Sequence, residues 1–122
     1  MTPSATPPRT PVLIVDDNRD TADSIALLLR LEGFESKAAY SAQDALDVLD
    51  GDTHFGAVVC DVRMPDVNGF DLFRAVRHRF PEMHVILVTG KEISDDDGMP
   101  FGATVLRKPV EAKALLAALN PG

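Results

Sequence analysis

Residues 12–18 read VLIVDDN, an uninterrupted apolar run that ends in two carboxylates and an amide. Four consecutive apolar residues predict a strand that is buried on both faces, as strands are in parallel sheets. Similar runs return at 57–61 (AVVCD) and 85–89 (VILVT), each with a polar residue at its end. Segments with helical spacing of apolar residues separate these runs. The alternation of strands and helices predicts an α/β fold, with a parallel sheet covered on both faces.

Two weaker strands and four helices complete the predicted order. A strand over 34–39 is expected nearer an edge of the sheet, and a short fifth strand over 104–106. The first helix is expected to stop at Gly33, and Ser41 is expected to cap the second. The inward faces expected of the four helices are, in chain order, Ala22, Ile25, Leu28 and Leu29; Ala42, Ala45, Leu46 and Leu49; Phe70, Phe73 and Val76; and Ala112, Leu115, Leu116 and Leu119.

The segment between the fourth and fifth strands breaks this regularity. Residues 91–100 contain three consecutive aspartates, Gly98 and Pro100, and few apolar side chains. Such a composition is poor for an amphipathic helix. A short turn of helix or a mobile loop is therefore expected there.

Length and composition fit a single domain with a short tail. The chain has 122 residues, enough for one core. Residues 1–10 read MTPSATPPRT and lack apolar periodicity, so they are expected to form a disordered Pro-rich tail or linker. Residues 11–122 are expected to form the folded domain.

Charge and cysteine content narrow the classes of partner. The net charge is −7, and no cluster of Lys and Arg is large enough for direct contact with nucleic acid. The apolar runs are too short to span a membrane, so no membrane partner is expected. The single cysteine, Cys60, rules out an internal disulfide, and nothing points to secretion. A cytoplasmic protein is therefore expected.

Polar residues follow the predicted strands at one edge of the sheet. They are Asp16 and Asp17, Asp61, Thr89 and Lys108. In the strand order 2-1-3-4-5, the carboxylates would flank the point where the order reverses, where ligands bind in open α/β sheets. Three gathered carboxylates repel one another unless a cation such as Mg²⁺ joins them. With the Thr89 hydroxyl and the Lys108 ammonium added, the set suits phosphoryl chemistry. These arguments leave open which carboxylate is the nucleophile.

The segments VLIVDDN, VVCDVRMPDVNG, ILVTG and LRKP, in this order, resemble the motifs of response-regulator receiver domains. The resemblance covers roughly residues 11–120. It implies a flavodoxin-like doubly wound five-stranded parallel sheet of order 2-1-3-4-5. The fourth helix of that fold, between the fourth and fifth strands, is expected to be atypical or shortened in this chain. It also implies that a histidine kinase or a histidine phosphotransfer protein phosphorylates Asp61, and that the domain signals by protein–protein contact.

The resemblance further implies a set of metal ligands. Asp17 and Asp61 would bind Mg²⁺ directly, together with the backbone carbonyl of Arg63. Asp16 would act mainly through water, and Mn²⁺ can substitute for Mg²⁺.

Other residues are implied around the phosphoryl group. Thr89 and Lys108 would hold its oxygens, and Pro109 would follow a cis peptide bond. The side chains of Arg63 and Lys91 would fringe the group and modulate its hydrolysis. The domain would promote its own phosphorylation and dephosphorylation without being a conventional enzyme.

The sequence departs from the family pattern on its predicted output side. Many receivers carry an aromatic residue three positions before the site lysine, where this chain has Val105. The stretch from Thr89 to Gly102 also looks short for the family. An unusual output face is therefore expected, with phosphorylation ordering residues 91–101 or changing contacts around 61–69.

Other interpretations are open from the sequence. Asp16 and Asp17, taken alone, could cap a helix. A small aspartyl-phosphate hydrolase would also pair a strand-end Asp with Mg²⁺ and Lys, but such enzymes typically carry two Asp residues two positions apart after the first strand. Here that region reads Asp16-Asp17-Asn18. A degenerate receiver would lack site residues that this chain retains. The domain could stand alone or come from a longer hybrid kinase.

Overall fold

The computed structural model describes residues 11–51, 53–64, 68–90 and 104–119. Five strands form one parallel sheet in the order β2-β1-β3-β4-β5. Their bounds are β1 Val12–Val15, β2 Ser36–Ala39, β3 Ala57–Asp61, β4 His84–Thr89 and β5 Thr104–Arg107. The predicted strand order and the flavodoxin-like doubly wound sheet are confirmed.

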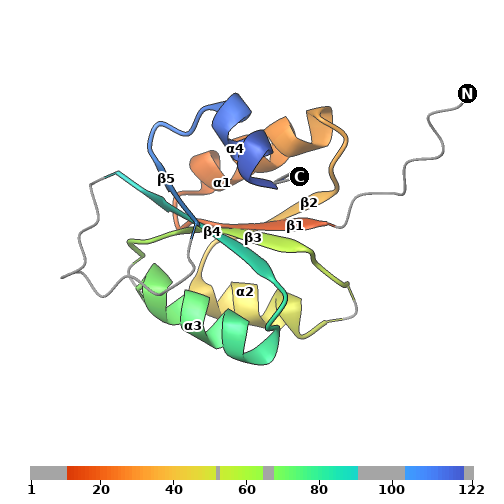
Figure 1. Ribbon diagram of the computed structural model, residues 1–122, viewed down its shortest axis with the longest axis vertical. Coiled ribbons are helices and arrows are strands. Elements are labelled where there is room, and N and C mark those ends of the chain that lie inside the picture. Colours follow the sequence, from red (N-terminus) through yellow and green to blue (C-terminus); the bar gives the residue numbers. More distant parts are fainter. Residues whose placement is uncertain (1–10, 52, 65–67, 91–103, 120–122) are drawn as a thin grey trace, which may run out of the picture.

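Helices cover both faces of the sheet (Figure 1). The described residues form α1 Arg19–Leu31, α2 Ala42–Leu49, α3 Gly69–Arg79 and α4 Ala112–Leu119. Figure 1 shows α1 and α4 above the sheet and α2 and α3 below it. None of the helices in the described part of the chain has both the length and the apolar character that crossing a bilayer requires.

Alternate residues of each strand enter two separate cores. In β1, Leu13 and Val15 pack with the residues of α2 and α3, whereas Val12 and Ile14 pack with those of α1 and α4. The central strands β1 and β3 are buried along their whole length. Because both faces are covered, these strands need apolar residues at every position up to Asp61, the last residue of β3, as the sequence predicted.

Polar caps fix where the helices begin. Asn18 precedes α1 and accepts from the backbone N–H of Thr21, and Ser41 precedes α2 and accepts from the N–H of Asp44. Gly33 follows α1 with φ +93°, a left-handed conformation that a glycine adopts without steric penalty. The predicted Ser41 cap and Gly33 stop are confirmed. The alternative that Asp16 or Asp17 caps the first helix is wrong, because Asn18 holds that position.

Several boundaries and faces differ from the prediction. The edge strand covers Ser36–Ala39 rather than 34–39, and Phe34 instead packs into the core beside α1. Ala26 is buried in α1, while Ile25 and Leu28 are only partly buried. Apolar spacing alone therefore does not decide which residues of these elements are buried.

Some predictions lie outside the described residues. They are the disordered tail predicted over 1–10 and the atypical or shortened helix predicted over 91–101. Val105, at the position where many receivers carry an aromatic residue, is partly buried and packs against the α2–α3 core.

Candidate functional site

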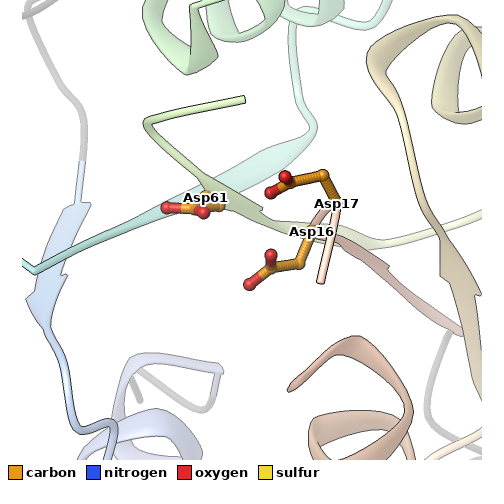
Figure 2. Close-up of side chains that lie close together, drawn as sticks. All are labelled: Asp16, Asp17 and Asp61. Atoms are coloured by element: carbon orange, nitrogen blue, oxygen red, sulfur yellow. The ribbon is translucent and has the colours of Figure 1, made fainter. Parts of the chain in front are cut away.

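Three carboxylates gather at the carboxyl edge of the sheet (Figure 2). Asp16 and Asp17 directly follow β1, and Asp61 is the last residue of β3. The strand order places β1 beside β3, with Val15 opposite Cys60. One carboxylate oxygen from each of the three aspartates lies within 4.8 Å of the other two. The convergence that the strand ends predicted is therefore present.

Two of these carboxylates are buried. Asp16 is 3% exposed and Asp61 is 8% exposed, whereas Asp17 is exposed to solvent. Burial raises the pKa of Asp16, and the neighbouring charges of Asp61 and Asp17 raise it further. The backbone N–H of Asn18, which donates to Asp16 Oδ1 at 2.9 Å, acts in the opposite direction, as does Lys108.

Lys108 brings a positive charge to the buried pair. Its Nζ lies 3.4 Å from Asp61 Oδ2 and 3.6 Å from Asp16 Oδ2. The backbone N–H of Lys108 donates to the carbonyl of Thr89 at 2.8 Å, which ties the end of β5 to the end of β4. The peptide bond between Lys108 and Pro109 is cis.

Thr89 ends β4 and is 2% exposed. Its strand pairs directly with β3, in a register that places Val88 opposite Asp61. The hydroxyl-bearing residue and the site lysine thus reach the same edge as the carboxylates, each from its own strand.

The chain reverses sharply after β3. The backbone N–H of Val62 donates to the carbonyl of Val88 at 2.9 Å, and that of Gly69 donates to the carbonyl of Val62 at 2.7 Å. Arg63 forms an isolated antiparallel bridge with Asn68, and its N–H lies 3.4 Å from Asp61 Oδ1. The side chain of Arg63 is exposed. These contacts hold the start of α3 against the end of β3.

The three aspartates suit a hard divalent cation. Carboxylate oxygens are the ligands that Mg²⁺ prefers, and Mg²⁺ usually takes only a few of them while keeping several waters. The exposed Asp17 leaves one side of the cluster accessible to water, and the buried pair supplies like charges that a cation would neutralise. The chemistry of this donor set fits Mg²⁺.

Sequence reasoning missed part of this site. Asn18 caps α1, which begins just after Asp16 and Asp17, and Asn68 caps α3, which begins beside Asp61. Both could have been predicted, because each is a polar residue just before an apolar helical pattern. Gly69 is the last residue of the motif VVCDVRMPDVNG, but its role could not be predicted, because that role depends on which backbone lies next to it. Lys91, a predicted modulating residue, lies outside the described residues.

A cavity of 640 Å³ opens beside the site. Three separate segments of the chain line this cavity, so no local pattern in the sequence could predict it. The lining residues are Asp20, Thr21, Ser24, Ile25, Val88, Gly90, Lys108, Pro109 and Val110.

Known proteins are similar to this chain in sequence and in fold. The chain is 39% identical over 108 residues to the response regulator protein FleR of Pseudomonas aeruginosa, covering 86% of this chain and 23% of FleR. It is 35% identical over 114 residues to the transcriptional regulatory protein CpxR of Escherichia coli K12, covering 89% of this chain and 47% of CpxR. The chain thus spans less than half the length of either relative.

Solved structures agree with these relatives. A crystal structure of a response regulator receiver protein from Pseudomonas putida superimposes with a TM-score of 0.85 at 30% identity, covering 96% of this chain and 100% of that one. Residues 12–120 match the family described as the response regulator receiver domain. Because that match spans the whole sheet and every residue of the carboxylate cluster, the chain belongs to the receiver-domain family of two-component response regulators.

Proposed function

We propose that this domain accepts a phosphoryl group on Asp61 from the phosphohistidine of a histidine kinase or a histidine phosphotransfer protein. One observation carries the proposal: the buried Asp61 carboxylate shares its corner of the sheet with two further carboxylates and with Lys108, 3.4 Å away. Membership of the receiver family supports the same function.

Mg²⁺ is the cofactor of this proposal, and Mn²⁺ can replace it. Asp17 and Asp61 would hold the ion with the backbone carbonyl of Arg63, and Asp16 would act through water. When bound, the ion neutralises charge on the phosphoryl oxygens. The proximity of the three carboxylates supports this assignment.

The residues of the chain have distinct roles in the transfer. A carboxylate oxygen of Asp61 forms a bond to phosphorus while the bond from phosphorus to the imidazole nitrogen breaks. The imidazole leaves with the bonding electron pair. The Lys108 ammonium, now shared between Asp61 and Asp16, would pair with a phosphoryl oxygen, and the Thr89 hydroxyl would donate to another. Loss of the acyl phosphate to water reverses the modification.

Output is part of the proposal. The domain would signal by protein–protein contact in the cytoplasm, without touching nucleic acid or membrane itself. The single cysteine is a buried free thiol, which fits a reducing compartment. The relatives are longer than this chain, so a downstream activity would come from another domain or another protein.

Intact mass spectrometry tests this function. After incubation with acetyl phosphate and Mg²⁺, the protein should gain the mass of one phosphoryl group, and the gain should vanish when EDTA removes the metal. Asp61→Asn, which keeps the size of the side chain, should not be modified. An unmodified parent protein in Mg²⁺ would overturn the proposal, and so would modification that proceeds equally in EDTA.

A further inference from the structure

The first residue of α3 lies unusually close to the backbone that carries Asp61. A Cβ atom built on Gly69 would lie 2.5 Å from the carbonyl oxygen of Asp61, 2.7 Å from the Cα of Val62 and 3.2 Å from the carbonyl carbon of Asp61. All three are backbone atoms, so no rotation of a side chain can relieve the overlap. Only a glycine lets the helix approach the strand end this closely.

Both sides of this contact are held in place. The backbone N–H of Val62 donates a hydrogen bond to the carbonyl of Val88 in β4, and the N–H of Gly69 donates one to the carbonyl of Val62. Phe70, the next residue of α3, is 4% exposed and belongs to the same core as Val62. Asn68 caps the helix by accepting from the N–H of Phe70 at 2.7 Å. A methyl group at position 69 must therefore displace either the start of α3 or the Asp61–Val62 peptide.

We infer that Gly69 is a positioning residue for the metal site. By letting α3 close onto the Asp61–Val62 peptide, it sets the direction of the Asp61 carboxylate and the place of the peptide that leads to the Arg63 carbonyl. The inference rests on the proposed function, in which these two groups are metal ligands. It adds a residue that touches neither the metal nor the phosphoryl group.

The two alkaline-earth ions respond differently to such a displacement. Mg²⁺ demands near-ideal octahedral geometry with short bonds, whereas Ca²⁺ accepts longer bonds and variable geometry. A shift of two ligands should therefore weaken Mg²⁺ binding more than Ca²⁺ binding. A variant that is merely less stable would bind both ions with unchanged relative affinity once folded.

The experiment titrates the full chain with Mg²⁺ and, separately, with Ca²⁺. The NMR signals of the backbone amides are monitored during each titration and give the two affinities. We expect Gly69→Ala to weaken Mg²⁺ binding by about tenfold, the lower end of the range for residues that orient metal ligands. Ca²⁺ binding should weaken by less, so the ratio of the two affinities should fall.

Two controls separate positioning from stability. Gly90→Ala adds the same methyl group near the site, where it would meet no atom within 4 Å in the described part of the chain. Val76→Ala loosens the packing of α3, since Val76 is fully buried, but leaves its first turn intact. Both should keep the parent's ratio of Mg²⁺ to Ca²⁺ affinity.

Each outcome is decisive. A parent protein that binds no Mg²⁺ would overturn the proposed function and this inference with it. A parent that binds Mg²⁺ and a Gly69→Ala variant with the same affinity ratio would overturn the inference alone, as would an equal fall of the ratio in Val76→Ala. If Gly69→Ala does not fold, Asn68→Ala decides, because it loosens the start of α3 without adding an atom. Its affinity ratio should fall by a smaller factor, and an unchanged ratio would overturn the inference.

Discussion

The carboxyl edge and the amino edge of this sheet handle charge in opposite ways. At the amino edge, where α2 and α3 end, Arg79 pairs with Asp50, and the two side chains are 39% and 49% exposed. At the carboxyl edge, Asp16 and Asp61 are buried beside a third carboxylate, with Lys108 between them. One edge pairs opposite charges in solvent, and the other gathers three carboxylates, two of them buried, around one lysine.

The difference separates stability from function. An exposed ion pair contributes little to the free energy of unfolding, and its loss should be tolerated. A buried cluster of carboxylates opposes folding unless a cation or a proton neutralises it. We therefore expect the carboxyl edge to hold a cation at some expense of stability. The variants below test that interpretation.

Removing the nucleophile should have the largest effect. Asp61→Asn keeps the shape of the side chain but not its nucleophilic oxygen, so the rate of phosphorylation by acetyl phosphate should fall by roughly a thousandfold or more. Phosphorylation is followed by intact mass over time. Arg79→Ala, at the opposite edge, serves as the control and should react at the parent rate. A similar rate in Asp61→Asn would exclude Asp61 as the acceptor.

The two aspartates after β1 should differ in their effect on Mg²⁺ affinity. Asp17→Asn removes a proposed direct ligand and should weaken Mg²⁺ binding by about a hundredfold, whereas Asp16→Asn, which acts through water, should weaken it by about tenfold. Titration calorimetry gives both constants. Equal losses of Mg²⁺ affinity, or a larger loss in Asp16→Asn, would contradict the assignment of Asp17 as a direct ligand and Asp16 as a water-mediated one.

Arg63 and Lys91, the two cationic residues that the receiver resemblance implies around the phosphoryl group, should have a smaller effect. Arg63→Ala combined with Lys91→Ala should speed the loss of the phosphoryl group by a few-fold, because two long side chains no longer shield the acyl phosphate from water. Phosphorylation itself should still occur. The measurement is the decay of the phosphorylated mass after the phosphodonor is removed. An unchanged decay would place both side chains away from the phosphoryl group.

The smallest effect should appear in stability. Without Mg²⁺ at pH 7, Asp16→Asn should raise the midpoint of thermal unfolding by a few degrees, because it removes a charge that is buried and that two neighbouring carboxylates repel. In saturating Mg²⁺ the parent should have the higher unfolding midpoint, since it binds the ion more tightly than Asp16→Asn and is stabilised more by it.

How the stability difference between Asp16→Asn and the parent changes with pH follows from the raised pKa of Asp16. A folded-state pKa above the unfolded value of 3.8 means that ionised Asp16 opposes folding at neutral pH. This penalty disappears as the pH falls through the raised pKa, because the carboxyl takes up a proton. The advantage of Asp16→Asn without Mg²⁺ should therefore shrink on acidification. A constant advantage down to pH 4 would mean that the charge is not its cause.

Much of this fold was predictable because the sheet is buried on both faces. Continuous apolar runs marked β1, β3 and β4, and the polar residue after each run marked the common edge. Parallel strands all end at one edge, and the order that the receiver resemblance implies places β1 beside β3, so the gathering of Asp16, Asp17 and Asp61 could be predicted. The edge strand β2 was less clear, because its short sequence SKAA carries little apolar signal.

What could not be predicted depends on contacts between distant backbones. The need for glycine at position 69 arises only because the start of α3 meets the Asp61–Val62 peptide. The burial of Ala26 rather than Ile25 depends on how α1 lies on the sheet, and the cavity beside Lys108 depends on three segments meeting. The response of residues 91–101 to phosphorylation stays a prediction.

The central claim is that Asp61, and neither of its two neighbours, carries the phosphoryl group. Borohydride reduces an acyl phosphate to the alcohol, which converts the phosphorylated aspartate to homoserine. After phosphorylation in Mg²⁺, reduction and proteolysis, peptide mass spectrometry should find homoserine at position 61 and intact aspartate at positions 16 and 17. Homoserine at position 16 or 17, or at neither these positions nor 61, would contradict the account.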